Sequence, residues 1–411
     1  MTTKKIIAAI FGLSLVLASA SFGDIVSNIS CTQRWPWNGK VDIDYTLTSG
    51  SNSGMPLFKL GFYGQIGSGS SFPLQSLSGD GASRVVVGEG TRRVTWDAYQ
   101  DLGATVDASD VQVVIVARES AMPAKYLVLD LNTYRVSERF DDPLSSDTAP
   151  KRTEIWFRRV EPGTFTMGSS AEDQAYFNSN YNNEDVHSVT ITKPFYIAIY
   201  TTTEAQFAKI DSETTITSMK PKTGLDYTDL RGSNVGTNWP GLGYRVDSGS
   251  FFDKLRTKVV GEFTFDLPTD AQWEMAARSK GDGTFIGDLT WNNGSPYAKT
   301  DATTDTNLNV VAWYKTNIRD VGLKAPNCIG LYDMHGNVWE WCLDWTQDHL
   351  GSSPVTDPVG PLHQISTQGQ RLRRGGASEN NPVDCRIGRR NPAMVGSQHT
   401  NYGFRMVIVE P

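Results

Sequence analysis

The chain has 411 residues, of which 39% are hydrophobic and 20% charged, a composition that supports an ordered core in one to three domains. Its formal net charge of −7 argues against a nucleic-acid-binding protein, because phosphate contacts require clustered lysine and arginine. The 38 glycines and 11 tryptophans favour many turns and large aromatic anchors over long helices.

The N-terminus is typical of a secretory signal. Lys4 and Lys5 precede an apolar run, residues 6–17, which is too short to span a bilayer, and small residues follow at Ala18 and Ala20. A buried N-terminal helix is the alternative. We expect a signal peptide over residues 1–23 and a secreted or periplasmic mature protein. After cleavage it would not span a membrane, because no other apolar run approaches about 20 residues.

Residues 24–120 have the pattern of a small all-β sandwich. Val41 to Leu47 alternates apolar and polar side chains, which is the period of a half-buried strand. Similar short segments follow, separated by Gly- and Ser-rich turns. The expected further strands are 57–63, 84–87, 93–96 and 111–116. No catalytic group of residues is evident here, which favours an adhesive or spacer module.

A connector is expected over residues 121–152, within which Tyr126–Leu131 has the composition of a strand. The remainder, residues 153–411, is the second domain. Only two of its segments have a helical pattern, Thr203–Ile210 and Pro268–Arg278, and Thr269 or Asp270 is suited to cap the second. The rest reads as short strands and long loops, so an irregular mixed α/β fold with internal ties is predicted.

The second domain carries a series of short motifs in a fixed order. They are Phe165-Thr166-Met167-Gly168, 187–191, 194–197, 203–207, Leu267–Glu274, Gly330–Trp341, Arg374-Gly375-Gly376 and Gly403-Phe404-Arg405. In this order, over about 255 residues, they closely resemble the formylglycine-generating enzyme (sulfatase-modifying factor) family. The resemblance implies an irregular mixed α/β fold related to C-type lectins. The N-terminal module lies outside it.

Active members of that family oxidise a cysteine of a sulfatase peptide to formylglycine, with two cysteines that bind copper. Soft thiolates suit Cu(I). After the glycine pair the resemblance leads us to expect a serine and two cysteines, but this chain has Ala377, Asn380 and Cys385 at those positions. Cys385 is therefore the one candidate catalytic residue that is retained. One thiolate does not make the two-coordinate site, so we do not expect copper.

The resemblance also implies a calcium ion in the segment 330–341. The matching ligands are the carboxylates of Asp333 and Glu340 and the carbonyl groups of Gly336 and Val338. Calcium prefers such hard oxygen ligands in a flexible geometry. The alternative is a plain turn in which Glu340 pairs with a buried arginine. We expect calcium.

Arginines and tryptophans crowd the C-terminal part of the chain. The arginines offer either a surface for anionic ligands or a set of buried ion pairs, with acids such as Asp333, Asp344 or Glu274. The tryptophans 339, 341 and 345 are expected to anchor the core. The arginines are 371, 373, 374, 386, 389 and 390.

The four cysteines, at positions 31, 328, 342 and 385, match no Cys-x-x-Cys pattern. A disulfide between Cys342 and Cys385 is predicted, partly because an oxidising compartment permits it. In addition, the family packs the segment after the glycine pair against the calcium loop. Cys328 is a rival partner for Cys342, and two free thiols are the alternative.

Two functions remain. The first is a catalytically divergent member that binds a peptide, a glycan or a protein surface through the former substrate cleft. The second is a formylglycine-generating oxidase that uses Cys385 with another ligand. The Ala377 and Asn380 positions favour the first.

Overall fold

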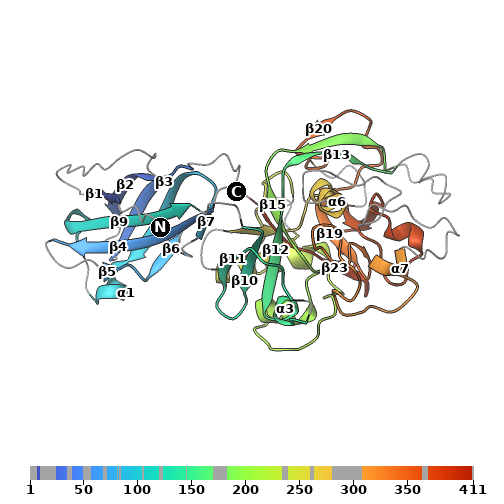
Figure 1. The fold of residues 1–411 in the computed structure, drawn as a ribbon, viewed down its shortest axis with the longest axis horizontal. Coiled ribbons are helices and arrows are strands. Elements are labelled where there is room, and N and C mark those ends of the chain that lie inside the picture. The colour runs from blue at the N-terminus through green and yellow to red at the C-terminus, as the bar shows by residue number, and fades with distance from the viewer. Residues whose placement is uncertain are drawn as a thin grey trace.

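The computed structural model describes residues 7–9, 25–34, 39–49, 57–67, 72–80, 82, 85–103, 106–119, 124–144, 146–169, 183–233, 239–259, 263–279, 308–362 and 369–409. The N-terminal part forms one β-rich body and the rest of the chain a second, which lie side by side along the long axis of the molecule (Figure 1).

Two antiparallel sheets make up the N-terminal body, and their inward side chains share one hydrophobic cluster. The alternation predicted for residues 41–47 is present, because Val41, Ile43, Tyr45 and Leu47 are all buried. One sheet has the order β1 (Ile7–Ala9), β9 (Val111–Glu119), β4 (Leu57–Ile66) and β5 (Phe72–Pro73), with β7 (Val85–Val87) also on β4. The other has the order β2 (Val26–Gln33), β3 (Lys40–Leu47), β8 (Gly90–Asp97) and β6 (Leu77–Gly79), and α1 (Ala98–Leu102) and the 3-10 turn Ala108–Asp110 follow β8.

The strand β1 lies inside the segment predicted as a signal peptide. Its three residues pair with β9 in an antiparallel register, Ile7 opposite Ile115. Cleavage of a signal peptide would therefore expose the backbone of β9 at that edge of the sheet.

The C-terminal body is built on a six-stranded antiparallel sheet. The segment 121–152 contributes two of its strands and the 3-10 turn Ala149–Lys151, so it is a structural part of this body as well as a connector. Tyr126 of β10 lies opposite Arg158 of β12, and the register continues to Asp130 opposite Glu154. The order is β11 (Arg135–Arg139), β10 (Tyr126–Asp130), β12 (Glu154–Val160), β15 (Phe195–Ala198), β24 (Val407–Val409) and β16 (Thr264–Asp266).

Three smaller sheets carry most of the segments with the family motifs. The glycine pair follows directly on the end of β21, and the segment 330–341 runs through β18 into β19. The sheets are β13 (Gly163–Met167), β14 (His187–Ile191) and β20 (Val355–Thr356); β17 (Ala312–Trp313) and β18 (His335–Gly336); and β22 (Asn391–Met394), β21 (Gln370–Arg374), β19 (Trp339–Trp345) and β23 (Tyr402–Phe404).

Both predicted helices are present, as α3 (Glu204–Asp211) and α6 (Asp270–Arg278). Each begins with a capping box, Thr203 with Gln206 and Thr269 with Gln272, so that side chains satisfy the first free amides. The sequence analysis missed three short helices, α4 (Tyr227–Arg231), α5 (Phe251–Lys258) and α7 (Leu308–Val311). Their lengths of five, eight and four residues give too few turns for a clear period.

Aromatic residues fill the core of the C-terminal body, as the tryptophan content predicted. Trp341 and Trp273 are fully buried, and Trp339 and Trp345 are nearly so. Two hydrophobic clusters lie on the two faces of the six-stranded sheet, since alternate residues of β10 and β12 belong to different clusters. None of the helices in the described ranges is long and apolar enough to cross a membrane.

The placement of β10 and β11 generates a truncation prediction. A fragment of residues 124–411 retains the whole sheet and should unfold cooperatively. A fragment of residues 153–411 loses buried side chains that include Leu127, Leu129, Leu131 and Val136, each worth about 2 kcal/mol of burial, and exposes the edge of β12. It should aggregate or melt without a sharp transition in circular dichroism. Equal melting curves for the two fragments would contradict this assignment.

Candidate functional site

The glycine pair makes a tight turn at the end of β21. Gly375 and Gly376 have φ values of 93° and 78°, in the left-handed region that favours glycine. A side chain on Gly376 would lie 2.8 Å from the Cys385 sulfur, so the turn packs directly against that residue. The three positions singled out in the sequence, 377, 380 and 385, are thus brought to one place.

Asn380 uses its side chain inside this turn. Its Oδ1 accepts a hydrogen bond of 3.0 Å from the amide of Ala377, and its own amide donates to the Ala377 carbonyl at 3.0 Å. The carbonyl group of Asn380 accepts from the Lys315 amide at 3.1 Å. Asn380 therefore stabilises the loop, and the amide oxygen that could serve as a metal ligand is already engaged.

Cys385 is fully buried, at 0% exposure, in a small apolar cluster. Its neighbours there are Leu308, Val311, Ala312 and Tyr314. Burial, and secondarily the charge of Asp384, raise the pKa of the Cys385 thiol far above its ordinary value. The thiol is consequently neutral, whereas a nucleophile or copper ligand has to be a thiolate.

The predicted disulfide between Cys342 and Cys385 is absent, since none of the four cysteines forms a disulfide. The two residues belong to different hydrophobic clusters, Cys342 on β19 and Cys385 at the end of the 3-10 turn Pro382–Cys385. Burial also raises the pKa of Cys342 well above its ordinary value. We had expected the segment after the glycine pair to pack against the calcium loop, but packing of two segments does not by itself bring two sulfur atoms within bonding distance.

The predicted calcium loop has an unusual backbone. Asp333, Gly336 and Asn337 have φ values of 56°, 76° and 64°. A side chain at Gly336 would lie 2.1 Å from the carbonyl oxygen of Trp313, so only glycine fits.

Glu340 is engaged by protein groups on both carboxylate oxygens. Oε1 accepts from Thr201 Oγ1 at 2.6 Å and from Arg405 Nη2 at 3.0 Å, and Oε2 accepts from Trp273 Nε1 at 2.7 Å and from Arg405 Nε at 3.0 Å. This is the arginine pairing that we gave as the alternative to calcium. Glu340 does not fit a calcium ion, because the Arg405 guanidinium already occupies its coordinating face.

Asp333 differs, because its carboxylate is only half satisfied. Oδ2 accepts from the Gly322 amide at 2.8 Å, whereas Oδ1 is buried and has no partner among the described residues. Burial raises the pKa of Asp333 to about 6. This lone oxygen fits a cation. Among the described residues no group of three or more His, Cys, Asp and Glu is placed to hold a metal ion, so carbonyl groups would have to complete such a site.

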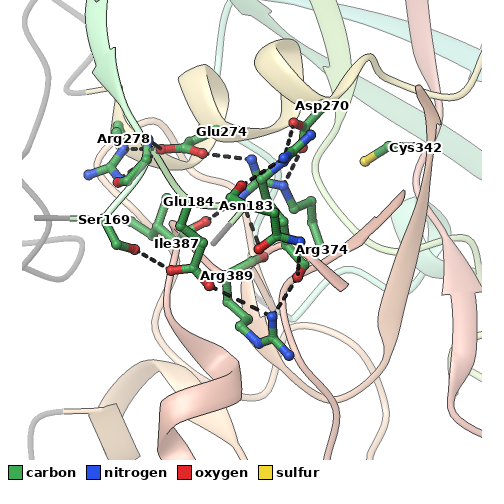
Figure 2. A network of polar contacts seen from close by, with 12 residues as sticks. Ser169, Asn183, Glu184, Asp270, Glu274, Arg278, Cys342, Arg374, Ile387 and Arg389 are labelled. Atoms are coloured by element: carbon green, nitrogen blue, oxygen red, sulfur yellow. Dashed lines mark hydrogen bonds and ion pairs between the residues drawn. The ribbon is translucent and has the colours of Figure 1, made fainter. Parts of the chain in front are cut away.

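Most of the C-terminal arginines form a buried ionic network (Figure 2). Arg374 joins Asp270 and Glu274, the latter at 2.6 Å, and Arg390 joins the other oxygen of Asp270 at 2.8 Å. Glu274 also binds Arg278 one turn further along α6, at 2.8 Å. Glu274, one of the three acids that the sequence suggested as arginine partners, does form such pairs. Asp270, the central acid of the network, was expected only as a helix cap.

A second acid, Glu184, holds Arg386 at 2.9 Å and Arg389 at 3.7 Å. Ser169 donates to the same carboxylate at 2.6 Å. Glu184 was not predicted from the sequence, because its arginine partners lie about 200 residues away. The one available signal was that the many arginines need acidic partners.

Arg371 and Arg373 are buried, have no carboxylate partner within the described part of the chain, and lie against aromatic rings. The Arg371 guanidinium is 3.3 Å from the Trp345 ring centre, and that of Arg373 is 3.7 Å from Tyr402. Burial lowers the pKa of both arginines to about 10. Cation–π contacts therefore replace ion pairs on this face of β21.

The comparisons with known proteins agree with the motifs. The family model of the sulfatase-modifying factor enzyme 1-like domain matches residues 145–409. The chain belongs to this family. The matched region contains the glycine pair, the segment 330–341 and the ionic network.

Curated relatives include two formylglycine-generating enzymes. That of Streptomyces coelicolor is 27% identical over 294 residues, which are 60% of this chain and 87% of the relative. That of Thermomonospora curvata is 34% identical over 155 residues, 34% of this chain and 48% of the relative. A serine/threonine-protein kinase pkn1 of Chlamydia pneumoniae is 34% identical over 140 residues, and the chain spans only 20% of its length.

Solved structures with a similar arrangement include PvdO from Pseudomonas aeruginosa, with a TM-score of 0.47 and 21% identity over 62% of this chain and 94% of that one. The Treponema denticola variable protein 1 gives a TM-score of 0.45 and 22% identity, covering 62% of this chain and 95% of that one.

The network generates a stability prediction. Replacing Glu274 with glutamine leaves the buried Arg374 and Arg278 without their shared counter-charge and should lower the free energy of unfolding by roughly 3 to 5 kcal/mol. The matched control is Glu213→Gln, because Glu213 is 77% exposed in its pair with Lys258 and its replacement should cost less than about 1 kcal/mol. Urea unfolding of both variants measures the difference; similar midpoints would show that the network contributes little.

Proposed function

We propose that this protein is a catalytically divergent sulfatase-modifying-factor-type member that binds a peptide, glycan or protein surface at the former substrate cleft. One observation carries the proposal: the only retained cysteine, Cys385, is buried and neutral, and the Asn380 amide that replaces the other cysteine is engaged in a turn. Neither group is available to copper. The alternative is a formylglycine-generating oxidase, which would require Cys385 and a second group, such as the Asn380 amide, to be available as metal ligands.

The surface beside the turn supports a binding role. The segment 313–319 runs next to it, since the amides of Lys315 and Thr316 donate to the carbonyl groups of Asn380 and Ser378 at 3.1 and 2.7 Å. On this segment two cations lie over the Trp313 ring, Lys324 at 4.2 Å and Arg319 at 5.5 Å from its centre. An aromatic face flanked by cations suits a partner with acidic groups.

Three further features belong to the same proposal. A secreted or periplasmic location, with residues 1–23 removed, would bring the cleft to external ligands. The N-terminal β-sheets would then act as a sandwich-type spacer or adhesive module. A relation to C-type lectins would agree with a binding function of an irregular α/β fold.

The first test concerns chemistry and accessibility together. Purified protein with copper should leave the cysteine of a Cys-x-Pro-x-Arg peptide unmodified, as measured by mass spectrometry. In the same sample iodoacetamide should label the exposed Cys328 at least tenfold faster than Cys385, because only an accessible thiolate reacts. Formation of the aldehyde, lost in Cys385→Ser, would establish the oxidase instead.

The second test concerns calcium, for which we propose Asp333, rather than Glu340, as the carboxylate ligand, together with carbonyl groups such as those of Gly336 and Val338. A chelator should then lower the melting temperature of the wild type, because an ion that binds only the folded state stabilises it. Asp333→Asn should abolish this sensitivity.

Glu340→Gln is the matched variant for the calcium test. It should lower the melting temperature equally with calcium and with chelator, because its partner is Arg405. Identical wild-type melting curves with chelator and with millimolar calcium would eliminate the calcium site.

A further inference from the structure

The C-terminal body contains a cavity that is separate from the turn formed by the glycine pair, Asn380 and Cys385. It is a cavity of about 440 Å³, within the range of small-molecule sites, beside the N-terminus of α6. Its wall combines apolar side chains with a few buried polar ones. The lining residues that matter here are Met167, Asp344, Leu350, Val355, Val359 and Arg390.

The segment 355–360 closes one side of this cavity and is held firmly. Its strand β20 pairs with β14, and Asp357 accepts hydrogen bonds from the Thr192 amide at 2.8 Å and from the Thr192 hydroxyl. Gly360 has a φ of 73° and lies close to Asp344. A Cβ atom added at Gly360 would be 2.9 Å from the Cβ of Asp344. The cavity is therefore preformed, which reduces the entropic cost of filling it.

Asp344 lines the cavity, and one of its carboxyl oxygens has no hydrogen bond from the described residues. The residue is 3% exposed, and among the described residues a single hydrogen bond reaches it, from the Asp270 amide to Oδ2 at 2.7 Å. Burial and the neighbouring charge of Asp270 raise the pKa of Asp344 to about 7. Below about pH 7 this group is thus mostly a neutral acid that can donate a hydrogen bond.

Arg390 supplies the second polar group of the wall and is 2% exposed. Its Nε binds Asp270 at 2.8 Å, and its Nη1 binds the carbonyl oxygens of Asn183 and Gln347 at 2.7 and 3.4 Å. Within the described ranges, nothing accepts a hydrogen bond from Nη2. Because Asp270 is shared with Arg374, Arg390 has only part of a counter-charge.

We propose that this cavity binds a small aliphatic carboxylate. Its carboxylate would lie between Nη2 of Arg390 and the carboxyl group of Asp344, and its hydrocarbon part against Met167, Leu350 and Val355. A guanidinium nitrogen and a neutral acid are the donors that a monoanion needs. A doubly charged phosphate or sulfate would meet the carboxylates of Asp270 and Asp344. Among the described residues that line the cavity there is no Phe, Tyr or Trp to stack on a sugar.

The proposal includes a dependence on pH. As pH rises through about 7, Asp344 loses its proton, becomes an acceptor and repels the ligand, so binding should weaken. The charged or titratable groups that face Asp344 are Asp270, Cys342, Arg371, Arg390 and Tyr244, and His187 and Asp357 share the cavity wall.

The experiment is a ligand-observed NMR titration of the full chain with isovalerate, with isovaleramide and isoamylamine as neutral and cationic counterparts. Isovalerate should bind at pH 6 at least tenfold more tightly than either counterpart, and at least tenfold more tightly than at pH 8.5. Asp344→Asn, which keeps a donor at every pH, should bind with little change between these pH values. Equal binding of the amide, or a preference for the amine, would overturn the proposal.

Leu350→Trp places a large ring in the cavity and should abolish isovalerate binding with an unchanged circular dichroism spectrum. The matched control is Leu323→Trp, at a 59% exposed leucine that does not line the cavity, and it should bind as the wild type does. Binding that survives Leu350→Trp, or a pH dependence that persists in Asp344→Asn, would place the ligand elsewhere or assign the proton to another group.

Discussion

The requirement that every buried charge has a partner that compensates it governs the C-terminal body. Arg374 is completely buried, and it reaches two acids of α6, Asp270 and Glu274, and the carbonyl oxygen of Ile387 at 2.6 Å. It thereby ties strand β21, helix α6 and the loop after Cys385 at one point (Figure 2). A fold with short strands and long loops has few regular hydrogen bonds between its parts, so such ionic ties replace the ladders of a larger sheet. Removing any one partner leaves an uncompensated charge in the interior.

The same strand solves the charge problem in two ways. Arg374 faces carboxylates, whereas Arg371 and Arg373, on the opposite face of β21, lie on aromatic rings. Strand alternation thus separates an ionic layer from an aromatic layer. The tryptophans of β19 belong to this second layer as well as to the core, which explains why aromatic and basic residues are concentrated in the same part of the chain.

The sequence predicted best what depends on near neighbours. The cap at Thr269, the helix that follows it and the alternation of Val41 to Leu47 are local patterns, and all are present in the structure. The family motifs identified the C-terminal domain, which the family model confirms. The cysteine pairing was wrong, because sequence order gives no directions for two sulfur atoms.

Long-range partners could not be predicted. Glu340 was expected as a metal ligand, and its partner Arg405 lies 65 residues further along the chain. Asp270 was recognised as a residue of the helix start, but its two guanidinium partners come from segments more than 100 residues away. The strand β10 had a strand-like composition, yet nothing local indicated which sheet it joins.

That strand fixes how closely the two halves of the molecule are coupled. Since β9 ends at Glu119 and the C-terminal body has begun by Ala124, the covalent tether comprises residues 120–123. The five Cα–Cα steps from Glu119 to Ala124 span at most about 18 Å. An ion pair between Lys59 and Glu138 bridges the two halves in addition. Anything attached to the N-terminal half is therefore held at high local concentration near the other half.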